Sequence, residues 1–152
     1  MKKICFLIFL LTPFLFIGQT MNPVKWEAKY SESSNGEGEI IATASIEKGW
    51  HVYSINLNPD AGAIPTTVTY SPGNNYTIIG KPVEEGVKEE FDKMFEMKIA
   101  SFEGKAIIKQ KIKRKDMKAF QTPLKIEYMV CNDKQCLPPK TIDIMLAVPA
   151  KK

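Results

Sequence analysis

Two cysteines near the end of the chain have the clearest capacity for chemistry. Cys131 and Cys136 lie in the segment VCNDKQCLPPK, and Cys5 is the only other cysteine. An extended chain would separate the two Cα atoms by about 16 Å, whereas a disulfide needs roughly 4.4 to 6.8 Å. The chain must therefore reverse between them, and Asn132 and Asp133 are turn-forming residues. We expect the two sulfurs to face each other across a hairpin between the last two strands.

This pair could be a structural cross-link or a reversible switch. Closing a loop of six residues stabilises a fold by about 2 kcal/mol in the chain-entropy model, against nearly 5 for a loop of about a hundred. Exchange requires a thiolate that can form and be reached. Lys134 and Lys140 favour that anion and Asp133 opposes it. The residues favour redox exchange, and a structural hairpin disulfide stays open as the alternative.

A metal centre is the third alternative. Zinc sites usually have four Cys, His or acidic ligands, and this chain offers Cys131, Cys136 and a single histidine, His51. Copper(I) accepts thiolate and thioether sulfur, and Met129 stands two residues before Cys131, but the sequence shows no methionine-rich cluster. We expect neither a metal nor a cofactor.

The N-terminus indicates export. Two lysines precede an apolar run from Ile4 to Ile17, and small or polar residues follow up to Thr20, which is the layout of a secretory signal peptide. Pro13 interrupts the run, which is shorter than the roughly 20 residues that a helix needs to cross a bilayer. Cleavage is therefore favoured over an uncleaved membrane anchor.

We expect residues 1–20 to be the signal peptide, which carries Cys5 away, and residues 21–152 to form one domain that is exported into an oxidising compartment. Disulfides persist in that oxidising compartment. The signal segment holds two lysines and no acidic residue, so its loss lowers the formal charge from +4 to +2. Such a charge gives no reason to expect a nucleic-acid partner. The lysines of the basic run KAIIKQKIKRK alternate with other residues, which indicates that they line the solvated face of a strand.

Short segments of alternating apolar and polar residues recur between turn-forming clusters, and no long stretch has helical spacing. The pattern predicts an all-β fold, an immunoglobulin-like β-sandwich of about seven or more antiparallel strands. The expected strands are residues 39–46, 50–57, 66–70, 76–83, 105–113, 124–130 and 141–148.

One acidic segment breaks this rhythm. EEGVKEEFDKMFEMK, residues 84–98, carries Phe91, Met94, Phe95 and Met97. The residues are compatible with a short helix that packs its aromatic side on the sandwich, or with a lid over a site.

Alternation also predicts the environment of the first cysteine. In LKIEYMVC, Leu124, Ile126 and Tyr128 point one way and the intervening residues point the other way. If the alternation continues to its end, Cys131 lies on the polar side of the strand.

The segments YMVCNDKQCLPPKTIDI, KGWHVYSINL and FDKMFEMKIASFEGKAIIKQKI together resemble the N-terminal periplasmic domain of the thiol:disulfide interchange protein DsbD and related disulfide-corrector domains. The resemblance covers roughly residues 25–149, and the cysteine pair followed by LPP is its most specific part. It implies an immunoglobulin-like sandwich whose two cysteines accept electrons from a thioredoxin-like partner and pass them to periplasmic disulfide proteins.

The resemblance also implies roles for individual residues. Cys131 and Cys136 match the family's catalytic pair, and Cys136 matches the cysteine that forms the mixed disulfide. Phe91 or Phe95 matches the phenylalanine of a cap loop. His51 and Tyr53 match aromatic residues that flank the site, and for His51 an ordinary strand histidine and a proton-handling residue are both open.

Two features differ from the family. Its best-known members have one more residue between the cysteines, so the hairpin here is tighter. Full-length carriers continue into a membrane domain and a thioredoxin-like domain, which this sequence does not contain. We therefore expect a separate thiol reductant, thioredoxin-like or membrane-embedded, as the electron donor. We expect a monomeric redox carrier of the protein-disulfide reductase type with exported disulfide-containing proteins as acceptors. The alternative is a non-enzymatic immunoglobulin-like binding module with a structural disulfide.

Overall fold

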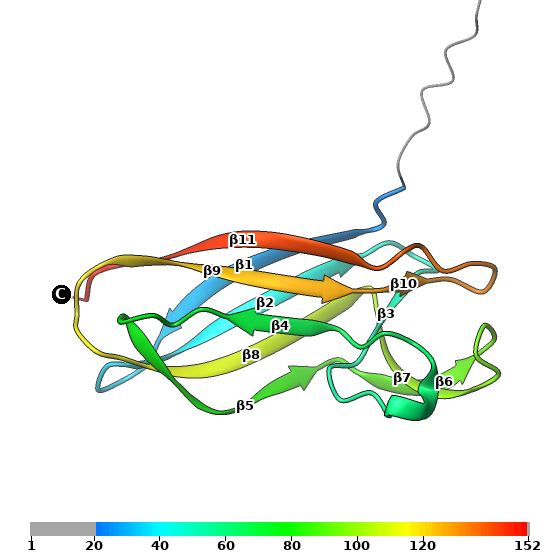
Figure 1. Cartoon of the computed structure of the whole chain (residues 1–152), viewed down its shortest axis with the longest axis horizontal. Coiled ribbons are helices and arrows are strands. Elements are labelled where there is room, and N and C mark those ends of the chain that lie inside the picture. The colour runs from blue at the N-terminus through cyan, green and yellow to red at the C-terminus, as the bar shows by residue number, and fades with distance from the viewer. Residues whose placement is uncertain (1–20, 152) are drawn as a thin grey trace, which may run out of the picture.

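The computed structural model describes residues 21–151 of the chain (Figure 1). The expected signal peptide and Cys5 lie outside the described residues. The strands are β1 (Val24–Glu32), β2 (Glu37–Ile46), β3 (His51–Tyr53), β4 (Thr67–Tyr70), β5 (Tyr76–Glu85), β6 (Lys88–Asp92), β7 (Met97–Glu103), β8 (Lys105–Arg114), β9 (Phe120–Tyr128), β10 (Val130–Cys131) and β11 (Lys140–Val148). One 3₁₀ turn, η1 (Pro59–Ala61), lies between β3 and β4.

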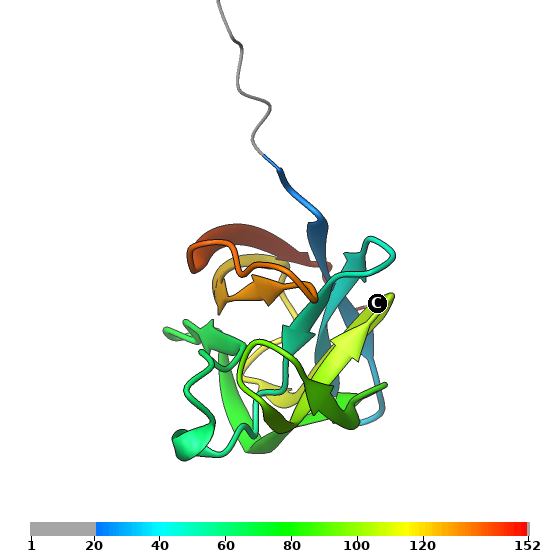
Figure 2. The same ribbon diagram turned by 90° about the vertical axis from the view of Figure 1, so that its right-hand side faces the viewer.

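These strands form three antiparallel sheets, whose strand orders are β1-β2-β8-β5, β11-β9-β4 and β10-β3-β7-β6. The first two sheets face each other along the long axis of the molecule, and the third lies at one end, on the right in Figure 1. Figure 2 looks onto this end. The all-β sandwich predicted from the sequence is therefore confirmed.

The core forms because each long strand buries alternate residues. Ile40, Ala42 and Ala44 of β2 are fully buried, as are Ile108 of β8 and Ile126 of β9. Residues with a two-residue period point to one face of a strand, so these side chains meet between the two long sheets. Burial of the apolar surface there supplies the main driving force for the fold.

The observed strands differ from the expected ones at several places. β1, β6 and β7 were not predicted, the strand expected at 50–57 is only the three residues of β3, and the strand expected at 124–130 is divided into β9 and β10. Segment 84–98 contains no helix, because its residues complete β5, form β6 and a turn, and begin β7. Among the described residues, no helix is long and apolar enough to cross a membrane.

The end sheet has two faces with different surroundings. Val52, Phe102 and Val130 point into the main core. Their neighbours Tyr53, Ile99 and Cys131 belong to a separate apolar cluster on the outer face. Because side chains alternate between the two faces of a strand, Cys131 lies on the face of the end sheet that is directed away from the sandwich interior.

Candidate active site

The cysteine hairpin that the sequence predicted is present, and its two cysteines form a disulfide. The Cα atoms of Cys131 and Cys136 are 4.0 Å apart. The carboxamide oxygen of Asn132 accepts hydrogen bonds from the backbone N–H groups of Lys134 and Gln135, at 2.9 Å each. This side chain therefore closes the turn as expected of an asparagine at its first position.

Strand register brings the disulfide into line with a histidine. Cys136 pairs with Cys131 in a β-bridge, Cys131 is directly opposite His51, and His51 is directly opposite Glu103. Directly opposed residues project from the same face of a sheet. The four side chains consequently form one row across the outer face of the end sheet.

The expected polar surroundings of Cys131 are wrong. Cys131 is fully buried, and Met129 on the same side is only 8% exposed. The alternation does continue, but the chain passes from β9 into β10 and pairs there with β3, so the side that is polar in β9 faces an apolar cluster in β10. Cys136 is half-buried and is the more exposed of the two cysteines.

The aromatic side chains near the pair differ in environment. Phe95, in the turn between β6 and β7, packs against the cluster that contains Cys131, and its ring centroid is 5.9 Å from that of Tyr53 in an edge-on arrangement. Phe91 is 62% exposed. Phe95 is thus the one of the two candidate phenylalanines that packs against the cysteine cluster.

His51 and Tyr53 share an acidic partner that the sequence reading missed. The hydroxyl of Tyr53 donates to Oδ2 of Asp92 at 2.7 Å. Nε2 of His51 is 3.1 Å from this carboxylate oxygen and 3.1 Å from the tyrosine hydroxyl. Asp92 is 41 positions from His51 in sequence, so only the pairing of β3 with β7 and of β7 with β6 brings them together.

Asp92 also organises the turn that holds Phe95. Its Oδ1 accepts hydrogen bonds from the backbone N–H groups of Met94 at 2.7 Å and Phe95 at 3.2 Å. Only 7% of Asp92 is exposed. One carboxylate therefore joins the His51–Tyr53 pair to the turn beside the cysteines.

Burial and hydrogen bonding act in opposite directions on Asp92. Burial alone would raise its pKa, but the hydrogen bond from Tyr53, the two backbone N–H donors and the charge of His51 together hold the pKa below its ordinary value. The pKa of Tyr53 is raised, first by burial and then by the hydrogen bond to Asp92 and its charge. An ionised aspartate beside a neutral tyrosine is the stable arrangement at neutral pH.

The tip of the β6–β7 hairpin reaches the cysteine hairpin. Lys93 forms an ion pair with Asp133, in the turn between the two cysteines. Both side chains are largely exposed, and such pairs contribute about 0–1 kcal/mol. Beside them lies a small polar pocket of about 90 Å³, whose lining includes His51, Asp92 and Asn132.

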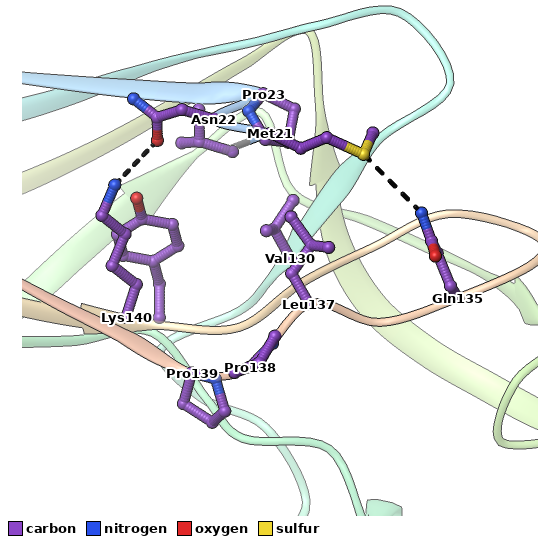
Figure 3. Close-up of a pocket in the computed structure, with 11 residues that line it drawn as sticks. Met21, Asn22, Pro23, Val130, Gln135, Leu137, Pro138, Pro139 and Lys140 are labelled. Atoms are coloured by element: carbon purple, nitrogen blue, oxygen red, sulfur yellow. Dashed lines mark hydrogen bonds between the residues drawn. The ribbon is translucent and has the colours of Figure 1, made fainter. Parts of the chain in front are cut away.

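An apolar pocket of about 390 Å³ lies behind the cysteine hairpin (Figure 3). Its lining includes Val130 and Leu137, which pair through a backbone hydrogen bond next to the disulfide. Lys140 bonds to Asn22 at its rim. Because neighbouring residues alternate in direction, this pocket lies on the opposite side of the hairpin from the sulfurs.

Among the described residues, no three His, Cys, Asp or Glu side chains form a group that could hold a metal ion. The arrangement instead offers a disulfide with one buried and one half-buried sulfur, beside a hydrogen-bonded histidine, tyrosine and aspartate. The structure is thus a β-sandwich with a disulfide hairpin at one end, and such a pair can take part in thiol–disulfide exchange.

Family comparison assigns the chain more narrowly. The model of the N-terminal domain of the thiol:disulfide interchange protein DsbD matches residues 19–147. The chain therefore belongs to this family, and thiol–disulfide exchange is the activity associated with it at the family level. A search of curated proteins found no match.

Solved structures support the fold. The reduced N-terminal domain of DsbD from Neisseria meningitidis has 13% sequence identity and a TM-score of 0.52, over 82% of this chain and 86% of that chain. The N-terminal periplasmic domain of ScsB from Proteus mirabilis has 12% identity and a TM-score of 0.58, over 86% of this chain and 49% of that one. The chain thus spans about half of the ScsB structure. These matches confirm the immunoglobulin-like fold.

Proposed function

We propose that this protein is a periplasmic redox carrier in which Cys131 and Cys136 cycle between dithiol and disulfide, relaying reducing equivalents to exported partner proteins. Family membership and the disulfide at the matching positions support this proposal. Residues 1–20 are its cleaved signal peptide, and residues 21–152 its mature domain.

The observation that carries the proposal is the unequal exposure of the two cysteines. Cys136 is half-buried, whereas Cys131 is completely buried. A partner can therefore approach Cys136 first, which agrees with the role that the family resemblance gives this residue. Cys131 is held next to it and resolves the mixed disulfide.

Reduction of a partner proceeds in two balanced steps. The Cys136 thiolate attacks a partner disulfide, a bond forms between Cys136 and one partner sulfur, and the other partner sulfur leaves as a thiolate. The Cys131 thiolate then attacks the sulfur of Cys136, which releases the first partner sulfur and forms the Cys131–Cys136 disulfide. The partner gains two electrons and the carrier loses them.

His51 is the candidate proton-handling residue in this cycle. It is directly opposite Cys131, and its ring is fixed by Asp92 and Tyr53. An imidazole so placed can accept the proton of a thiol and return it in the reverse reaction.

Phe95 is the proposed cap. It packs against the cysteine cluster from a turn whose backbone is held by Asp92, so partner docking that displaces this turn would uncover the pair. A membrane-embedded or thioredoxin-like thiol reductant is the donor that returns the disulfide to the dithiol. The carrier acts as a monomer.

Trapping of the mixed disulfide tests the proposal. A Cys131→Ser variant, expressed in cells that export it, should accumulate disulfide-linked adducts through Cys136 that disappear on reduction. Cys136→Ser is the matched control and should trap far less, because the remaining sulfur is buried. Equal trapping by both variants, or none by either, would contradict the assigned roles.

The rival is a binding module in which the disulfide only rigidifies a contact loop. The apolar pocket of about 390 Å³ behind the hairpin favours this rival, because an apolar pocket can receive a side chain of a bound partner. The rival predicts that partner binding survives substitution of both cysteines by serine and that no covalent adduct forms.

A further inference from the structure

Four sulfur-bearing side chains belong to, or pack against, the apolar cluster on the outer face of the end sheet. Cys131 and Met129 are buried members of the apolar cluster on the outer face of the end sheet, and Cys136 and Met97 pack against it. Met97 comes from β7, more than thirty positions before Cys131, so the sequence alone shows only Met129 beside the pair. The fold therefore places both methionines in the same apolar cluster as the cysteine pair.

Met129 is the methionine best placed to join the two cysteines. It stands two residues before Cys131 and belongs to the same buried cluster, so the two side chains share a face. Met97 stands six residues along β7 from Glu103, which is in the row of Cys131 and His51. Because each residue of a strand advances by about 3.3 Å, Met97 is roughly 20 Å along the sheet from that row. Met97 is therefore too far away to bind one ion together with the cysteines.

The chemistry of this set selects one kind of metal. Thiolate and thioether sulfurs are the ligands that copper(I) prefers, whereas structural zinc sites need four N, S or O ligands. His51 is directly opposite Cys131, but its Nε2 is already within hydrogen-bond distance of Asp92 and Tyr53. The remaining donors are two cysteines and one thioether.

We propose that the reduced protein binds one copper(I) ion through Cys131, Cys136 and Met129. Two thiols lose their protons when the ion binds, two copper–thiolate bonds form, and the oxidation state of copper does not change. The disulfide form cannot bind in this way, because its sulfurs are bonded to each other. Copper(I) would therefore stabilise the dithiol state by mass action and compete with thiol exchange.

The low exposure of the cluster suits such a site. Cys131 is fully buried, Tyr53 is fully buried, and Phe95 packs over the same cluster. An apolar shell limits access of water and oxidants to a bound metal. The half-buried Cys136 gives the ion a route of entry.

The test uses the protein lacking the predicted signal segment, since all strands and the whole core of the described structure lie within residues 21–151. The pair is reduced chemically, the reductant is removed anaerobically, and copper(I) is titrated in competition with bicinchoninate. We expect one ion per reduced chain and none per oxidised chain. This measurement requires no partner protein, so its outcome is independent of the proposed relay.

Methionine variants identify the third ligand. Met129→Leu should weaken copper(I) binding by at least the roughly tenfold that loss of an outer-shell partner costs. Met97→Leu, in the same cluster, and Met145→Leu, which is 62% exposed on β11, should retain the affinity. Leucine keeps the apolar volume, so the fold should survive these changes.

Absence of copper(I) binding to the reduced protein would overturn the proposal. So would an unchanged affinity in Met129→Leu, or a loss in Met97→Leu as large as that in Met129→Leu. Thiol exchange measured on Met129→Leu separates the two functions, because the relay should persist in this variant when copper(I) binding has fallen.

Discussion

His51 and Cys131 occupy directly opposite positions on β3 and β10, and their side chains project from the same face of the sheet. This register connects the disulfide to a network that continues through Asp92 to the turn bearing Phe95. A change at any of these residues should therefore affect the cysteine pair or its cover.

Asp92→Ala should lower the free energy of unfolding by about 1–3 kcal/mol, because Tyr53 and the turn amides lose a buried acceptor. Asp92→Asn should cost less, since its carboxamide oxygen can still accept from those amides. Urea denaturation of both variants measures the difference. Equal stability of wild type and Asp92→Ala would show that the network contributes nothing to the fold.

The contribution of Asp92 should depend on pH in a defined direction. Its folded-state pKa lies below the ordinary value of 3.8, so its stabilising effect is complete above that value and is lost as the pH falls through the folded pKa. The stability difference between wild type and Asp92→Asn should shrink as the pH falls below 3.8. A difference that stays the same as the pH falls well below 3.8 would contradict this assignment.

Tyr53 should make folding stability depend on pH in alkali, whereas Asp92 makes it depend on pH in acid. Its folded-state pKa is raised above the ordinary value of 10.0, so its contribution is present below 10.0 and is lost as the pH rises towards the folded pKa. Tyr53→Phe should make the stability fall less steeply with rising pH than it does in wild type, which urea denaturation at increasing pH can measure. The variant would disprove the assignment if it kept the same dependence as wild type.

Phe95→Ala should speed reduction of the disulfide by dithiothreitol. The edge-on contact with Tyr53 is worth about 0.5–1.5 kcal/mol beyond the buried area. Because opening of the cap no longer breaks this contact, the rate of reduction should rise by roughly twofold to tenfold. Phe91→Ala is the matched control and should leave the rate unchanged, because that side chain is 62% exposed. Equal rates in the two variants would exclude Phe95 as the cap.

Reduction of the disulfide should leave the domain folded. A loop of six residues gains only about 2 kcal/mol from cross-linking, and the turn keeps the hydrogen bonds of Asn132. Urea denaturation of oxidised and reduced protein gives the difference directly. Unfolding of the reduced form would mark the disulfide as structural.

The sequence revealed the parts of the site that depend on local pattern. The cysteine hairpin was predicted because an extended chain would hold the two Cα atoms too far apart for a disulfide. The alternation of apolar and polar residues predicted the long core strands such as β2 and β8. β1 carried the same signal, since Val24 and Trp26 alternate with charged residues and are buried. β6 carried none, because its KEEFD sequence is almost entirely exposed.

The parts that were missed depend on long-range pairing. The burial of Cys131 follows from the transfer of the chain from one sheet to another after Tyr128, and local alternation cannot detect such a change of partner. The role of Asp92 in the network requires three strands to align. Phe91 and Phe95 were equivalent by sequence, and only the turn geometry distinguishes the exposed ring from the packed one.

The most direct test of the account is the equilibrium reduction potential of the Cys131–Cys136 pair, titrated against glutathione or dithiothreitol and followed by thiol alkylation. We predict a value in the range of exchange-active pairs, roughly −120 to −270 mV. A value below about −300 mV is typical of structural disulfides and would contradict the redox relay.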